Sequence, residues 1–158
     1  MITAIIYDSH HGTTTKVAQQ IQETLGREKT QVFNLKENQE IELSDYEQII
    51  VGGSVHAGQV QKKVKKFCAE NEAILLEKPL GLFLCGMHHQ EAENELKEAF
   101  PQSFRNHAKA VRFLGGEFLF DRMNFFEKMI VKKIAGIRES KSELDTPKIK
   151  SFSAEMLP

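Results

Sequence analysis

The stretch TAIIYDSHHGTTTKVAQQIQETLG, residues 3–26, decides the fold class. Its start, TAIIYD, is β-branched and apolar almost throughout, which is typical of a strand buried on both faces. After a polar turn, Val17, Ile21 and Leu25 recur at helical spacing, and Gly26 marks the end of that helix. A buried strand followed at once by an amphipathic helix predicts a parallel sheet, because parallel strands need a crossover that is long enough to hold a helix.

The same order of elements continues along the chain. Further strands are predicted at 30–35, 48–55, 79–86 and 109–120, with helices over 61–75 and 90–100 and a helical turn at 42–46. Strands and helices that alternate with short connections place helices on both faces of a parallel sheet. The sequence therefore predicts a doubly wound, five-stranded α/β fold in a single domain spanning residues 1–158.

Composition narrows the class of function. The formal net charge is −1 and the charged residues are interspersed, so we expect no binding of nucleic acid. No run approaches the roughly 18 apolar residues of a membrane span, and no basic leader precedes the first strand, so we expect a cytoplasmic protein. Cys68 and Cys85 are too few for a disulfide framework. We expect reduced thiols, with Cys85 acting as a small buried apolar residue.

Three polar loops follow the first, third and fourth predicted strands, and ligands of doubly wound sheets bind at the carboxyl ends of the strands. These loops are SHHGTTT (9–15), GGSVHAGQV (52–60) and CGMHHQEAE (85–93). The first presents hydroxyls and backbone N–H groups at the start of a helix, which suits either a phosphate or an ordinary helix cap. Because G-x-G-x-x-G and G-x-x-x-x-G-K-[ST] are both missing, a mononucleotide fits better than a dinucleotide or a nucleoside triphosphate.

The S-H-H-G-T-T pattern resembles the phosphate loop of flavodoxins, usually [ST]-x-[ST]-G-x-[ST], with His11 where that family prefers a hydroxyl. The order of elements is also flavodoxin-like over nearly the whole chain. The segments VGGSVHAGQVQKKVKKF (51–67) and GGEFLFDRMNFFEKMIVKKIAG (115–136) look like the flavodoxin-type, menaquinone-linked protoporphyrinogen oxidases of bacteria. That resemblance covers about residues 1–137, but the long insertion expected before the fifth strand is missing or much reduced.

The resemblance implies FMN as the cofactor. The residues that would hold its phosphate are Ser9, His10, His11, Gly12, Thr13 and Thr14. The residues that would flank its ring are Ser54, Val55, His56, Ala57 and Gly58 in one loop and Cys85, Gly86, Met87, His88 and His89 in the other. We therefore expect a small flavoenzyme of the protoporphyrinogen-oxidase or quinone-linked type, whose partners are a redox protein or a quinone and a porphyrin. The alternatives are a flavodoxin-type electron carrier and a non-catalytic ligand-binding domain.

Five of the six histidines fall in these three loops. Beside a flavin they could supply protons, with His56 and His88 as the candidate catalytic residues, or they could be exposed residues at the rim. We expect no metal, because adjacent histidines rarely aim at one ion and no carboxylate or cysteine motif accompanies them. The loops carry histidine and methionine where flavodoxins have aromatic and acidic residues. The resemblance therefore implies a higher flavin potential than that of low-potential carriers.

The segment DRMNFFEKMIVKKIAGI (121–137) predicts a basic amphipathic helix. Its apolar side comprises Phe125, Phe126, Met129, Ile130 and Ile134, and its basic residues are Lys128, Lys132 and Lys133. Since TPKIKSFSAEMLP (146–158) contains Pro147 and few periodic apolar residues, we expect 121–137 to be the last helix on the sheet. The alternative is peripheral contact with an anionic membrane through 122–137, where a quinone would be reached.

Overall fold

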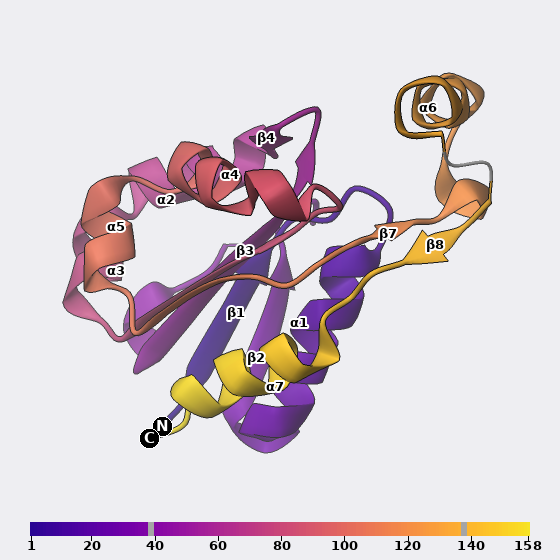
Figure 1. Ribbon diagram of the computed structural model, residues 1–158. Helices are drawn as coiled ribbons and strands as arrows, with labels where there is room; N and C mark the ends of the chain where they lie inside the picture. Colours follow the sequence, from indigo (N-terminus) through magenta and orange to yellow (C-terminus); the bar gives the residue numbers. More distant parts are fainter. Residues whose placement is uncertain (38–39, 137–138) are drawn as a thin grey trace.

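The computed structural model describes residues 1–37, 40–136 and 139–158, and it shows a parallel sheet between two layers of helices (Figure 1). Within these residues the main sheet has the order β2-β1-β3-β5-β6. Its strands are β1 (Thr3–Tyr7), β2 (Thr30–Asn34), β3 (Gln48–His56), β5 (Leu80–Cys85) and β6 (Ala110–Phe113), and β4 (Gln59–Val60) pairs antiparallel with β3. The predicted doubly wound, five-stranded parallel sheet is confirmed, and strand order reverses between β1 and β3.

Helices cover both faces of the sheet (Figure 1). The α1 face carries α1 (Thr13–Leu25) and α7 (Thr146–Glu155), and the other carries α2 (Lys62–Glu70), α3 (Glu72–Glu77), α4 (Ala92–Ala99) and α5 (Gln102–His107). Successive strand residues point to opposite faces, so Ile5 packs in the core under α1 while Ile6 packs in the core under α2. Short helical turns complete the chain at η1 (Arg27–Lys29), η2 (Leu43–Asp45) and η3 (His89–Glu91).

The predicted helix over 61–75 is two helices. Asn71 ends α2 and starts α3, and its Nδ2 donates to the carbonyl of Phe67 at 2.9 Å. A side-chain amide that bonds the local backbone competes with the helical pattern, which explains the break.

The predicted fifth strand, 109–120, ends early. β6 stops at Phe113, and Gly115 has a φ of +81°. A Cβ at Gly115 would lie 2.1 Å from the carbonyl oxygen of Glu143, so only glycine permits this approach. Beyond it, β7 (Glu117–Phe118) pairs antiparallel with β8 (Lys141–Ser142) in a separate two-stranded sheet.

The last helix on the sheet is α7, and the prediction of 121–137 for this role is wrong. Ile149, Phe152 and Met156 of the C-terminal segment are buried in the core beside α1. Pro147 lies in the first turn of α7, where its missing N–H costs nothing, and the Asp145 side chain accepts from the Lys148 N–H at 3.0 Å. The proline that argued against a helix is therefore part of its start signal.

Residues 117–136 and 139–142, which we call the arm, project from the carboxyl edge of the sheet (Figure 1). The arm holds β7, η4 (Phe120–Arg122), α6 (Phe125–Ile130), η5 (Val131–Ala135) and β8. Phe125 and Phe126 are 71% and 74% exposed, so the predicted apolar side of α6 does not pack on the sheet. Of the predicted segment 122–137, Ile137 and the side chain of Ile134 lie outside the described residues. No helix in the described ranges is long and apolar enough to cross a membrane.

Candidate functional site

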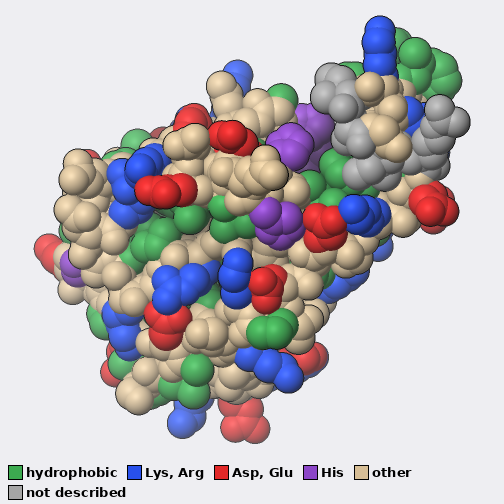
Figure 2. Space-filling model, in the orientation of Figure 1, with side chains coloured by type: hydrophobic (Ala, Val, Ile, Leu, Met, Phe, Trp, Pro, Cys, Tyr) green, Lys and Arg blue, Asp and Glu red, His purple; other side chains and the backbone are tan. Residues whose placement is uncertain are grey.

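A cavity of about 90 Å³ lies at the carboxyl ends of β1, β3 and β5, beside the arm. All three predicted loops line it, through Ser9, His10, His11, Thr13, Ser54, Val55, His56, Cys85, Gly86 and Met87. Gly116, Glu117, Phe118, Met123, Glu127 and Val131 complete the lining. Histidine side chains gather where the projecting segment meets the body (Figure 2). The loops thus meet where strand order reverses, as expected for a ligand site of this fold.

Some predicted residues do not line the cavity, namely Gly12, Thr14, Ala57, Gly58, His88 and His89. Ala57 and Gly58 form the turn between β3 and β4, with φ values of +51° and +77°. His88 is exposed, and its Nδ1 lies 3.9 Å from Glu95 Oε1. The structure therefore separates the two candidate catalytic histidines, because only His56 reaches the cavity.

The loop between β1 and α1 has the features of an anion site. Gly12 precedes α1 with a φ of +98°, and its N–H donates to Ser9 Oγ at 2.9 Å. The first N–H groups of a helix have no intrahelical acceptor and carry the positive end of the helix dipole. A Cβ at Gly12 would lie 2.1 Å from Arg122 Nη1, and that guanidinium donates to the His11 carbonyl at 3.0 Å. The loop therefore offers unpaired N–H donors at the start of α1, and the Arg122 guanidinium lies directly over Gly12.

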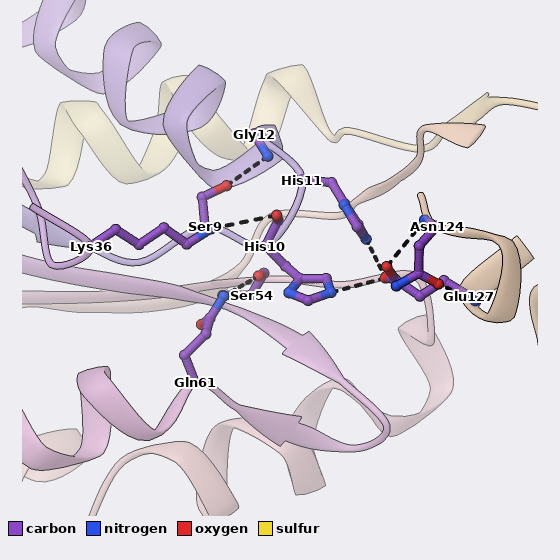
Figure 3. Close-up of polar contacts among 9 residues, drawn as sticks. All are labelled: Ser9, His10, His11, Gly12, Lys36, Ser54, Gln61, Asn124 and Glu127. Atoms are coloured by element: carbon purple, nitrogen blue, oxygen red, sulfur yellow. Dashed lines mark hydrogen bonds and ion pairs between the residues drawn. The ribbon is translucent and has the colours of Figure 1, made fainter. Parts of the chain in front are cut away.

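Two carboxylates of the arm accept hydrogen bonds from this loop. Glu127 Oε2 lies 2.9 Å from His10 Nε2 and 2.6 Å from His11 Nε2 (Figure 3). Glu117 Oε1 accepts from Thr13 Oγ1 at 3.1 Å. Glu117 and Glu127 thus accept hydrogen bonds from donors that a bound phosphate would also use. The loop fits an anion once the two carboxylates release these donors.

Glu117 and Glu127 are ionised near neutral pH. Burial disfavours the charged form of Glu117, but hydrogen bonds, chiefly from Lys16, hold its pKa below the usual value. Burial also opposes ionisation of Glu127, yet the Asn124 N–H and the two histidine rings lower its pKa. The arm therefore adds two negative charges to a cavity whose three predicted loops contribute histidine and methionine, and the raised flavin potential stays a prediction.

His56 lines the cavity and has a lowered pKa. Burial lowers the pKa of His56, and the nearby charge of His10 lowers it further. The ring centroids of His10 and His56 lie 4.5 Å apart. His56 is therefore mostly neutral near pH 7 and has a ring nitrogen that can accept a hydrogen bond or bind a metal.

Both cysteines are free and buried, as predicted. Burial raises the pKa of Cys68 and of Cys85 to about 12. Because the thiolate is the reactive form, neither thiol is poised for redox chemistry at neutral pH.

The residues of the arm are the part of the site that the loop motifs did not reveal. Glu117, Met123, Glu127 and Val131 line the cavity, and Arg122 covers Gly12. One signal for Glu127 is present in the sequence: NFFE (124–127) is a capping box, in which Asn124 and Glu127 each bond the other's backbone N–H. That signal locates the start of α6 but not the contact with His10.

Together the sheet and the site define a flavodoxin-like α/β protein. The flavodoxin domain family model matches residues 4–145, and the chain belongs to that family. No curated protein matches the sequence significantly.

Solved structures share this fold at low identity. Oxidised flavodoxin 1 from Bacillus cereus has a TM-score of 0.60 at 17% identity, covering 98% of this chain and 96% of that one. Flavodoxin from Fusobacterium nucleatum bound to flavin mononucleotide gives 0.52 at 16% identity, covering 99% and 97%. The flavodiiron core from Synechocystis gives 0.55 at 17% identity, covering 98% of this chain and 34% of that one.

Proposed function

We propose that this protein binds FMN in the cavity and serves as a flavodoxin-type electron carrier. The observation that carries the proposal is the meeting of an anion-binding loop with the ends of β3 and β5 where strand order reverses. Membership of the flavodoxin domain family and the FMN bound to the Fusobacterium flavodoxin support the choice of cofactor. Bound FMN supplies the redox chemistry, and the protein supplies the binding groups and their electrostatics.

The roles of the residues follow from their positions. The hydroxyls of Ser9 and Thr13 and the first N–H groups of α1 would bind the phosphate, and Arg122 would add positive charge over the loop. Val55 and Met87 offer apolar surface to the ring.

The arm must move outward for FMN to enter. Small-molecule sites measure roughly 300–1,000 Å³, whereas this cavity measures about 90 Å³. Met123, Glu127 and Val131 of the arm line the cavity, so an outward movement of the arm would enlarge it. Glu127 would then release His10 and His11, since a carboxylate and a phosphate repel each other at one set of donors.

The test is spectroscopic. We expect the purified protein to bind one equivalent of FMN, with quenched flavin fluorescence, and to be bleached by dithionite and re-oxidised by an added electron acceptor. Gly12→Val should weaken FMN binding at least tenfold, while Gly26→Val, at a similar φ but away from the cavity, should not. Failure to bind FMN in excess would overturn the proposal.

One observation favours a quinone-linked flavoenzyme of the protoporphyrinogen-oxidase type as a second candidate. Glu127 and Val131 line the cavity, while Phe125, Phe126, Met129 and Ile130 of the same segment are exposed next to Lys128 and Lys132. A basic amphipathic helix of this kind binds anionic membranes, where quinones are dissolved.

Vesicles distinguish the two candidates. A quinone-linked enzyme predicts that anionic vesicles containing menaquinone re-oxidise the reduced flavoprotein at least tenfold faster than zwitterionic ones. Phe125→Ser with Phe126→Ser should remove this preference, and added protoporphyrinogen should give porphyrin fluorescence. Equal rates and no porphyrin would leave the electron carrier as the function.

A further inference from the structure

We propose that His10, His56 and Glu127 form a binding site for a divalent transition metal of the zinc type. Their ligand atoms all lie within 4.8 Å of one another. The three residues come from separate segments: the loop after β1, the end of β3 and helix α6. Figure 3 shows the ring of His10 pointing toward the carboxylate of Glu127.

The donor set suits zinc. Zinc binds imidazole nitrogen and carboxylate oxygen at about 2.0–2.2 Å, so tetrahedral ligand atoms lie about 3.4 Å apart. His10 Nε2 and Glu127 Oε2 are 2.9 Å apart, and small side-chain rotations would bring His56 to the same centre. Two imidazoles and one carboxylate leave a fourth position for water, as in open zinc sites.

The carboxylate is already oriented by groups around it. Glu127 Oε1 accepts from the Asn124 N–H at 3.3 Å, and Oε2 lies 2.6 Å from His11 Nε2. Metal ligands are commonly held by such surrounding hydrogen bonds, which lower the cost of ordering them. We therefore assign His11 as a positioning residue.

Metal binding has a structural consequence because Glu127 belongs to the arm. A metal held by His10, His56 and Glu127 ties α6 to the loop that precedes α1. Metal and FMN should then oppose each other, because FMN requires Glu127 to release His10. The opposition between metal and FMN rests on the proposed function, whereas the metal site itself does not.

Direct titration with a metal alone tests the site. Tag-free protein, stripped with a chelator, should bind one equivalent of Zn²⁺ by calorimetry, and Co²⁺ should give the visible absorption of a four- or five-coordinate site. Glu127→Gln and His56→Ala should each weaken binding at least tenfold. His107→Ala is the matched control, since His107 lies outside the cavity and contacts the Lys78 carbonyl. Circular dichroism checks that each variant is folded.

Three results would overturn the site: no saturable binding, equal affinity in all variants, or binding lost in His11→Ala but kept in His56→Ala. FMN titration with and without saturating Zn²⁺ tests the opposition, and we expect the apparent Kd for FMN to rise at least tenfold. An unchanged Kd contradicts the opposition. If FMN fails to bind without any metal, the proposed function fails, while the Zn²⁺ titration still decides the metal site.

Discussion

Helices α6 and α7 are both amphipathic, and both follow the last strand of the main sheet. The apolar residues of α7 are buried against the sheet, whereas those of α6 are exposed to solvent. Phe152 of α7 is 0% exposed and packs edge-on against Phe83 of the sheet. Phe126 of α6 is 74% exposed, because α6 is carried on the β7–β8 pair beyond the sheet edge. Apolar periodicity therefore identifies a helix face, and the path of the chain decides what covers that face.

The largest expected effect is a difference in the free energy of unfolding between an alanine variant of α7 and one of α6. Phe152→Ala should lower the free energy of unfolding by about 3–5 kcal/mol, since it empties a closely packed position. Phe126→Ala should change it by no more than about 0.5 kcal/mol. Urea denaturation of the two variants measures both values. Similar losses would mean that α6 is packed in solution, and the contrast would be lost.

The two buried cysteines of the body, in contrast to the exposed arm, make the free energy of unfolding depend on pH. The folded pKa of Cys68 and Cys85, about 12, exceeds the unfolded value of about 8.5, so the native state holds protons that the unfolded state releases. Their contribution is complete below pH 8.5 and is lost as pH rises toward 12, on the order of 2 kcal/mol per thiol at pH 10. Urea titrations at several pH values measure it.

Alanine variants provide the control for these thiols. The alkaline loss should shrink in Cys68→Ala and Cys85→Ala, and a thiol reagent at pH 8 should label the native protein only after unfolding. Rapid labelling of the folded protein would contradict the burial of both thiols.

Substitutions at two glycines test the contact between Arg122 of the arm and the loop that precedes α1. Gly12→Ala and Gly26→Ala both force alanine into positive φ, which lowers the stability of each variant. Only at Gly12 would the new methyl meet Arg122. We expect a stability loss by urea denaturation in both variants but a larger loss of FMN affinity in Gly12→Ala. Equal FMN affinities would show that Arg122 does not rest on the loop in solution.

The smallest free-energy difference concerns opening of the arm. The apolar residues of α6 are exposed, and β7 and β8 pair over only two residues each, so few contacts stabilise the arm. Local unfolding of the arm should therefore cost less free energy than local unfolding of the body. Trypsin should cut after Lys128, Lys132 or Lys133 before it cuts after the exposed Lys62 and Lys66 of α2, as mass spectrometry of the first fragments can show. First cuts in α2 would reverse the predicted order.

The strands, the sheet class and the three site loops could be predicted because they depend on local patterns and on one topological rule. The contact between His10 and Glu127 joins residues 117 positions apart, and no local pattern encodes it. Gly115 and Pro147 mislead a local prediction, since Gly115 turns the chain just beyond β6 and Pro147 lies in the first turn of α7. Local signals thus predict the strands and most helices, whereas long-range packing decides which helix covers the sheet and which residues of the arm complete the site.

The binding of FMN compared with riboflavin, which lacks the phosphate, tests the central claim most directly. If the loop after β1 holds the phosphate, fluorescence titration should give a Kd for FMN at least tenfold lower than that for riboflavin. Gly12→Val should remove most of that difference. Equal affinities for the two flavins, or no binding of FMN, would contradict the assignment of this loop as a phosphate site.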